Sequence, residues 1–232
     1  GAMKGRLDGP VIGCESAEPF FASLPFPPTG AQRRAAADAI ADMRSGKAMN
    51  RLVQGDVGSG KTLVAAACIW AVCSSGAQCA MMAPTEILAR QHFETLTRQL
   101  APLGIEAVLL TGSMTARQKR EALKKLADGS AHVAVGTHAL ISGGVDFKNL
   151  ALVVTDEQHR FGVRQRAALS EKGGSPHVLV MSATPIPRTL ALMLYGDLDV
   201  SVIDELPPGR QKVDTFAVGQ AYRERLNRFI EK

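Results

Sequence analysis

Short apolar segments alternate with longer helical stretches along most of this 232-residue chain. The apolar segments show no polar alternation, which is typical of strands buried on both faces. Such strands, separated by helices, predict an α/β fold with a mostly parallel sheet flanked by helices on both faces. The expected strands are Arg51–Gln54, Cys79–Ala83, Ala107–Thr111, His132–Gly136, Ala151–Thr155 and His177–Ser182. The expected helices are 61–74, 86–100, 115–128, 163–170 and 187–195.

The composition suits a globular domain with a sizeable core. Hydrophobic residues make up 46% of the chain and charged residues 21%, which excludes wholesale disorder, collagen and coiled coil. The net charge of +5 permits a polyanionic partner without requiring one. None of the four cysteines forms a C-x-x-C pair, so we expect free thiols in a reducing cytoplasm. The longest apolar run, Leu63–Cys73, is too short to span a bilayer, and we expect no membrane contact.

Proline-rich segments divide the chain into three parts. Residues 1–28 are interpreted as an N-terminal extension whose first three residues are a cloning remnant. Residues 29–203 are expected to form the α/β domain, which opens with Thr29 and Gln32 in capping-box spacing. A composition shift marks residues 204–232 as a linker followed by new elements. These elements either start a second domain outside the chain or pack back on the first sheet, and the motifs below favour the second domain.

One segment fits the phosphate-loop pattern G-x-x-x-x-G-K-[ST] and lies between an expected strand and an expected helix. Its glycines allow backbone N–H groups to face phosphate oxygens, and the helix start adds partial positive charge. Lys61 is expected to reach the β- and γ-phosphates and Thr62 to ligate Mg²⁺. A chance glycine-rich turn is the alternative, which this context disfavours. The candidate nucleotide-binding residues here are Gly55, Asp56, Val57, Gly58, Ser59, Gly60, Lys61 and Thr62.

An acidic pair, Asp156 and Glu157, directly follows the expected strand Ala151–Thr155. A strand tip places carboxylates at the sheet edge where ligands bind in α/β proteins. Asp156 is expected to hold Mg²⁺, directly or through water, and Glu157 to polarise the attacking water. A solvated turn would explain the pair if it stood alone, but the phosphate loop upstream favours catalysis. The expected cofactors are therefore ATP and Mg²⁺.

Seven blocks in chain order resemble the first motor domain of superfamily 2 helicases, most closely the RecG family of branched-DNA helicases. The resemblance implies a RecA-like P-loop NTPase domain. The families of the transcription-repair coupling factor and the primosomal helicase share several blocks but match the last one less well. The blocks are Gln54–Thr62, Ala83–Ala89, Leu110–Ser113, Gly136–Leu140, Asp156–Gly162, Ser182–Thr189, and Tyr195–Val200 together with Leu206–Arg210.

The resemblance also implies roles around the nucleotide. Gln32 would recognise adenine, although the same side chain suits the helix cap. Phe26 would flank adenine, or else belong to the core or form a hydrophobic staple. Ser182 and Thr184 would link the γ-phosphate site to DNA, and His159, grouped with the catalytic residues, would couple them to the acidic pair unless its role is structural.

Five further residues are implied to contact DNA, because they fall in blocks that resemble the family's DNA-contacting motifs. Short hydroxyl groups suit phosphate oxygens, which fix register without reading sequence. Helix capping or turn formation is the alternative for the hydroxyl residues, and plain solvation is the alternative for the arginine. The basic side of helix 115–128 is interpreted as a solvated face. The five residues are Thr85, Thr111, Ser113, Thr137 and Arg188.

The remaining histidines lack the spacing of metal ligands and are expected to be structural or surface residues. They are His92, His132, His138 and His177.

The implied function is that of an ATP-dependent DNA helicase motor that remodels branched DNA, such as forks and Holliday junctions, in recombination and repair. It implies a bacterial, nucleoid-associated protein of the cytoplasm and DNA binding without sequence preference. A second helicase domain and an N-terminal wedge domain would be missing, so we expect this fragment to hydrolyse ATP weakly or not at all. The alternatives are a translocase motor of the transcription-repair coupling or primosomal type, and a nucleotide-gated DNA-binding module without turnover.

Overall fold

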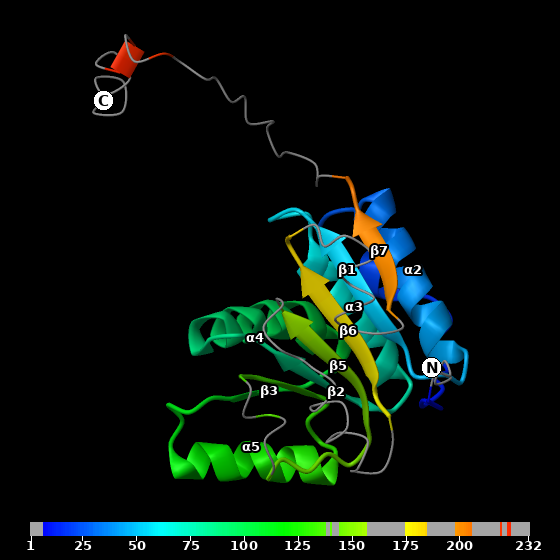
Figure 1. Ribbon diagram of the computed structural model, residues 1–232. Helices are drawn as coiled ribbons and strands as arrows, with labels where there is room; N and C mark the ends of the chain where they lie inside the picture. The colour runs from blue at the N-terminus through cyan, green and yellow to red at the C-terminus, as the bar shows by residue number, and fades with distance from the viewer. Residues whose placement is uncertain are drawn as a thin grey trace, which may run out of the picture.

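Seven parallel strands form one sheet in the order β3-β4-β2-β5-β6-β1-β7 (Figure 1). The computed structural model describes residues 7–137, 140, 144–156, 175–184, 198–205, 219 and 222–223. The strands are β1 (Asn50–Gly55), β2 (Gln78–Met82), β3 (Ala107–Leu110), β4 (Val133–Gly136), β5 (Leu150–Asp156), β6 (His177–Ser182) and β7 (Asp199–Ile203). The predicted parallel α/β architecture is confirmed.

Every expected strand is present, with each end within one residue of its predicted place. The central strands β2, β4 and β6 are buried along their whole length, as their unbroken apolar character requires. The edge strand β7 was not predicted, because Asp199 and Ser201 interrupt its apolar pattern. It pairs with β1 and completes the sheet on that side.

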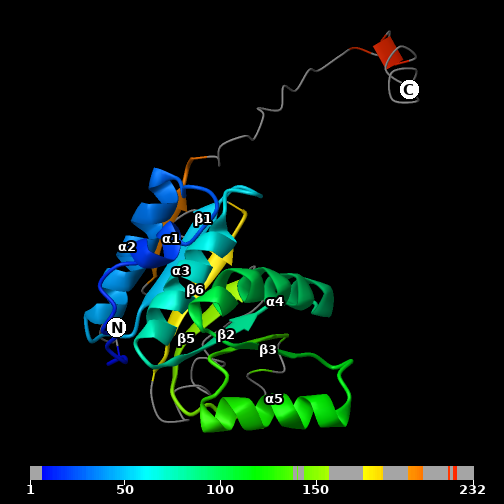
Figure 2. The same ribbon diagram turned by 180° about the vertical axis from the view of Figure 1, so that it is seen from behind.

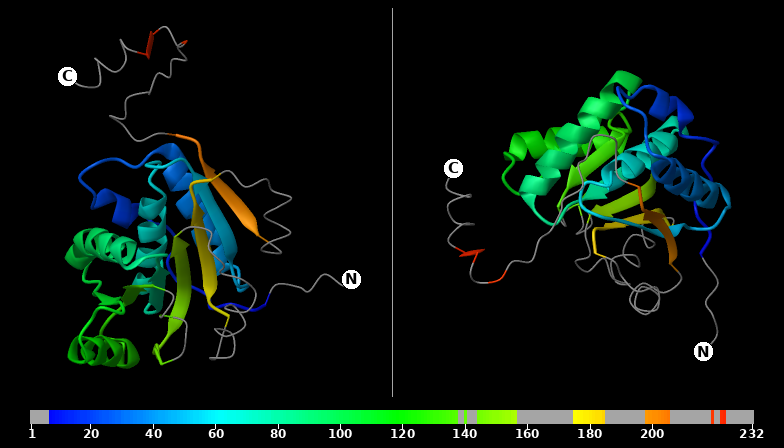
Figure 3. Two further views of the ribbon diagram at one scale, coloured as in Figure 1. Left: turned by 60° about the vertical axis from the view of Figure 1, so that its left-hand side comes forward. Right: turned by 90° about the horizontal axis from the view of Figure 1, so that it is seen from above.

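Helices cover both faces of the sheet. They are α1 (Glu18–Ala22), α2 (Gly30–Arg44), α3 (Lys61–Ser74), α4 (Glu86–Leu100), the 3-10 helix η1 (Ala101–Leu103) and α5 (Ala116–Asp128). The layer of α2, α3 and α4 lies on one face, with the apolar α3 at its centre (Figures 2 and 3). On the other face, Ala122 and Leu126 of α5 pack against apolar side chains of the sheet. The expected helices 163–170 and 187–195 lie outside the described residues.

The segment before α2 packs against the α/β body. Phe20 and Phe21 of α1 are buried, and the ring of Phe20 lies 6.4 Å from that of Trp70 in α3. His177 at the start of β6 donates from Nε2 to the carbonyl oxygen of Pro10, 2.6 Å away, and accepts from the Met49 backbone N–H. A helix as short as α1 is not expected to leave a periodic pattern in the sequence, which explains why it was not predicted.

All four cysteines are free thiols, and three of them are buried. Among the described residues, no helix combines the length and the apolar character that crossing a bilayer requires.

Candidate nucleotide-binding site

The phosphate loop joins the carboxyl end of β1 to the start of α3. Gly58 and Gly60 have φ angles of +77° and +88°, in the left-handed region that favours glycine. A Cβ atom on Gly55 would lie 2.6 Å from the Ser59 hydroxyl oxygen, so the loop closes tightly over the end of the strand. Helix α3 begins directly after the loop, and its N-cap Gly60 supplies no side-chain cap. A helix start of this kind favours a bound phosphate.

The charge and the polar atoms of the loop suit a polyphosphate. The Lys61 ammonium donates to the carbonyl oxygens of Gly55 and Asp56, at 2.7 and 2.8 Å, which holds its positive charge inside the loop. The Ser59 hydroxyl is buried and has no hydrogen-bond partner within the described part of the chain. A buried polar atom of this kind calls for a partner from a ligand or from water. The residues present therefore fit the phosphates of a nucleotide.

Gln32 links α2 to this loop. Its side-chain oxygen accepts from the Thr29 backbone N–H at 2.9 Å, and its own backbone N–H donates to the Thr29 hydroxyl, so the predicted capping box is confirmed. Its amide nitrogen donates to the carbonyl oxygen of Ser59 at 2.8 Å. An amide has two donor hydrogens and two acceptor lone pairs, so each end retains capacity for a base. Phe26 is 49% exposed, which excludes the core role for its ring.

Asp156 lies at the same edge of the sheet as the phosphate loop. It ends β5, where it stands beside Met181 of β6, and Met181 stands beside Val53 of β1. Neighbouring strands are about 4.8 Å apart, which places Asp156 roughly 10 Å across the edge from β1. Its carboxylate and the hydroxyl of Thr62 in the first turn of α3 are oxygen ligands of the type that Mg²⁺ takes.

His92 contacts the Asp156 carboxylate, which was not predicted. Its Nε2 donates to Oδ2 at 2.5 Å, and the side chains are 9% and 17% exposed. The ring comes from the buried side of α4, a stripe that also contains Ala89 and Leu96. A polar residue on an apolar stripe needs a hydrogen-bond partner, and that is the signal by which the sequence could have revealed it.

Ser182 and Thr184 lie between the phosphate loop and Asp156. Ser182 ends β6 level with Gln54 of β1, and β6 separates β1 from β5. The buried Ser182 hydroxyl accepts from the Thr184 backbone N–H at 3.2 Å and lies 3.1 Å from the Thr184 hydroxyl. Their implied partner His159 lies outside the described residues, as do Glu157, Arg188 and His138.

Two of the blocks implied to contact DNA meet at the start of α4. Thr85 is the N-cap of this helix, and its hydroxyl accepts from the Leu88 backbone N–H, so the capping role is confirmed. The Glu86 carboxylate accepts from the Gly112 backbone N–H and from the Ser113 hydroxyl, at 2.8 and 2.7 Å. These contacts lower the pKa of the Glu86 carboxyl group, with the Ser113 hydroxyl as the largest cause.

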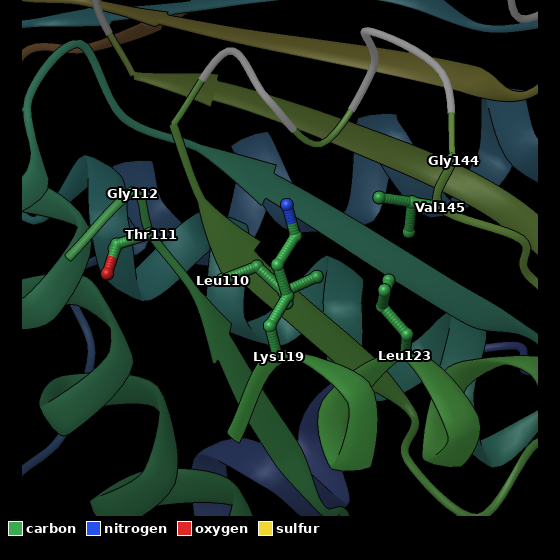
Figure 4. Close-up of a pocket in the computed structure, with 7 residues that line it drawn as sticks. All are labelled: Leu110, Thr111, Gly112, Lys119, Leu123, Gly144 and Val145. Atoms are coloured by element: carbon green, nitrogen blue, oxygen red, sulfur yellow. The ribbon is translucent and has the colours of Figure 1, made fainter. Parts of the chain in front are cut away.

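Thr111 and Thr137 follow β3 and β4, so they lie at the carboxyl edge as well. A hollow of about 190 Å³ opens beside the end of β3, and the ammonium group of Lys119 extends from α5 into it (Figure 4). One cation of the basic helix face thus reaches the region where candidate phosphate contacts gather. The hollow is lined by Leu110, Thr111, Gly112, Lys119, Leu123, Gly144 and Val145.

Comparisons with known proteins agree with this geometry. The family model for DEAD/DEAH box helicases matches residues 31–193. The chain is 52% identical over 213 residues to the ATP-dependent DNA helicase RecG of Bacillus subtilis, covering 92% of this chain and 31% of that protein. It is also 52% identical over 231 residues to RecG of Thermotoga maritima, covering 100% and 29%.

A solved structure of RecG bound to a three-way DNA junction superposes with a TM-score of 0.86 at 46% identity. The match covers 97% of this chain and 30% of that one. The chain therefore spans about a third of the length of the relatives it matches.

Proposed function

We propose that this chain, which belongs to the DEAD/DEAH box helicase family, is the first RecA-like motor domain of an ATP-dependent DNA helicase that acts on branched DNA. The observation that carries the proposal is the shared sheet edge: the phosphate loop follows β1, and Asp156 ends β5 two strands away. The relatives named as RecG, and the solved structure of RecG bound to a three-way DNA junction, support branched DNA as the substrate. They favour this substrate over the transcription-coupled and primosomal alternatives.

In this proposal the nucleotide phosphates lie on the loop and on the start of α3, where Lys61 supplies positive charge. Thr62 and Asp156 would hold Mg²⁺, which neutralises phosphate charge when bound. Gln32 would orient adenine from its position beside the loop. Glu157, the residue after Asp156, would orient the attacking water, and His159 with Ser182 and Thr184 would connect this site to DNA.

The DNA contacts would be made along the same edge. The hydroxyl groups of Thr85, Thr111 and Thr137 would contact phosphate oxygens together with Arg188, which gives register without sequence preference. Ser113 would join them only when its hydroxyl donates to a phosphate in place of the Glu86 carboxylate. We also propose that the motor works with a second helicase domain and an N-terminal wedge domain outside these residues, and that it acts at the bacterial nucleoid in the cytoplasm.

Nucleotide binding provides the first test. Mg-ATP at one hundred times its dissociation constant should stabilise the fold by about 2.7 kcal/mol, which would raise the melting temperature by roughly 5–10 °C. Lys61→Ala should abolish this shift. An equal shift in that variant would overturn the assignment of the loop.

Turnover provides the second test. ATP hydrolysis should be measured with this chain at low salt, with and without a three-way junction, and with Glu157→Gln as the control. A missing transition-state arginine from a second domain can cost about 10³–10⁵ in turnover, so we expect binding with little hydrolysis. Strong junction-stimulated hydrolysis that depends on Glu157 would contradict the need for a second domain. Junction binding should weaken steeply with added salt.

A further inference from the structure

Helix α4 makes polar contacts at two separate places. Near its start, Glu86 holds the Gly112 backbone and the Ser113 hydroxyl, and Arg90 donates to the same hydroxyl at 2.9 Å. Six residues after Glu86, His92 donates to the Asp156 carboxylate. Six residues advance about 9 Å along a helix. One helix therefore joins the segment after β3 to the candidate magnesium ligand at the end of β5.

The position of His92 does not follow from packing alone. The residue is 7% exposed, and its neighbours on the buried stripe are the apolar Ala89, Leu96 and Leu100. An apolar side chain would fill such a place without any polar group to satisfy, whereas a buried imidazole N–H needs an acceptor. The Asp156 carboxylate provides that acceptor.

The contact constrains the carboxylate in a way that matters for metal binding. A carboxylate has two oxygens, and a hydrogen bond to Oδ2 fixes the rotation of the group while the other oxygen can face a cation. A residue that hydrogen-bonds to a metal ligand without touching the metal orients that ligand. Removing such a hydrogen bond typically costs 10–100-fold in metal affinity.

We propose that His92 is a positioning residue, which holds the Asp156 carboxylate in the orientation that binds Mg²⁺ and ties that orientation to α4. The inference rests on the proposed function in one respect, that Asp156 is a magnesium ligand.

The experiment titrates Mn²⁺, as a spectroscopic probe for Mg²⁺, into the chain at a fixed concentration of ADP. His92→Leu keeps much of the side-chain volume but removes the donor, so it should weaken Mn²⁺ binding about 10–100-fold. His92→Gln retains an N–H donor and should restore most of the affinity. The matched control is His132→Leu. His132 directly precedes β4, its ring accepts from the Glu106 backbone N–H at 3.0 Å, and its replacement should leave Mn²⁺ binding unchanged.

Asp156→Asn, measured in the same titration, separates the hypothesis that Asp156 is a magnesium ligand from the hypothesis that His92 positions it. If Asp156→Asn leaves Mn²⁺ affinity intact, the proposed magnesium site fails. If Asp156→Asn loses affinity while His92→Leu keeps the wild-type value, the role of His92 is overturned and the magnesium site stands. Melting temperatures measured without ligand report on packing. If His92 had only a structural role, His92→Leu would lower the melting temperature without changing the metal affinity of the folded protein.

Discussion

The side-chain amide of Gln32 donates a hydrogen bond to the carbonyl oxygen of Ser59, 2.8 Å away. The oxygen of the same amide accepts from the Thr29 backbone N–H, so one buried side chain ties the first turn of α2 to the phosphate loop. A shift of Ser59 would break this bond and disturb the cap of α2. Nucleotide binding and the position of α2 should therefore depend on each other.

Comparing a Gln32 variant with a variant of its capping partner Thr29 should separate the effect on the α2 cap from the effect on nucleotide binding. Gln32→Ala removes the bond to Ser59 and half of the capping box, whereas Thr29→Ala removes the cap hydroxyl and leaves the bond to Ser59. Loss of a cap costs about 1 kcal/mol, so urea denaturation should show a similar loss of stability in both. Only Gln32→Ala should weaken ATP binding, by about tenfold for one lost buried hydrogen bond. Equal ATP affinities in calorimetric titrations of the two variants would contradict a role for Gln32 at the loop.

Gly60 should tolerate no side chain, for two independent reasons. Its φ angle is +88°, and a Cβ atom there would lie 2.2 Å from the amide nitrogen of Gln32. Gly76 has a similar φ of +80° but open space around it, so Gly76→Ala measures the backbone cost alone, about 1–2 kcal/mol. Gly60→Ala should destabilise the chain further and abolish the thermal shift with Mg-ATP, while Gly76→Ala should keep that shift. Thermal melts of the two variants that match each other would show that the Gln32 contact is unimportant.

Arg51 should contribute more to stability than an exposed ion pair. It is 8% exposed in β1, and its guanidinium donates to the Asp42 carboxylate of α2 at 2.8 Å and to the Ser201 hydroxyl of β7 at 2.7 Å. Arg51→Met leaves both partners without their donor, which should cost about 2–3 kcal/mol. The control is Arg117→Met, which removes an exposed pair with Glu121 and should cost no more than about 0.5 kcal/mol. Urea denaturation of both variants tests the difference, and equal losses would show that β7 is not held by this network.

Most of the sheet could be predicted because its strands are short, apolar and separated by helices with clear periodicity. Strand β7 could not, since Asp199 and Ser201 break its pattern and its pairing with β1 joins segments about 150 residues apart in the sequence. The buried Ser201 hydroxyl accepts a hydrogen bond from Arg51, a residue 150 positions earlier, so the sequence around β7 gives no sign of this contact. Helix α1 escaped prediction because five residues are too few for a helical period.

The same division between local and distant contacts applies to the site. The phosphate loop is formed by consecutive residues, so the spacing of its glycines and Lys61 was enough to identify it in the sequence. The bond from Gln32 to Ser59 and the contact of His92 with Asp156 join residues 27 and 64 positions apart, so they depend on how helices α2 and α4 pack on the sheet. The histidine on the buried stripe of α4 was nevertheless a readable signal that a polar partner lay beneath that helix.

His177 should make the stability of the chain depend on pH. Burial lowers its pKa, outweighing the opposing effects of the Pro10 carbonyl and the Asp42 charge, which raise it. The ring accepts from the Met49 N–H through Nδ1 and donates to Pro10 through Nε2, so the folded state holds the neutral form. Unfolded histidine titrates near pH 6.5, above the folded pKa, so the unfolded chain binds more protons as the pH falls below that value. The contribution of neutral His177 to the free energy of unfolding is complete above about pH 6.5 and is lost as the pH falls toward the folded pKa.

The pH dependence should therefore disappear in a variant that keeps one hydrogen bond but cannot titrate. His177→Asn places an amide oxygen near the position of Nδ1, where it can still accept from the Met49 N–H. Between about pH 7.5 and about pH 5.5, the wild-type free energy of unfolding should fall by up to about 1.4 kcal/mol per pH unit from this group. His177→Asn should start less stable, because the bond to Pro10 is lost, and should follow a flatter profile over that range. Parallel urea-denaturation profiles for the two proteins would mean that protonation occurs elsewhere and that His177 does not carry the pH response.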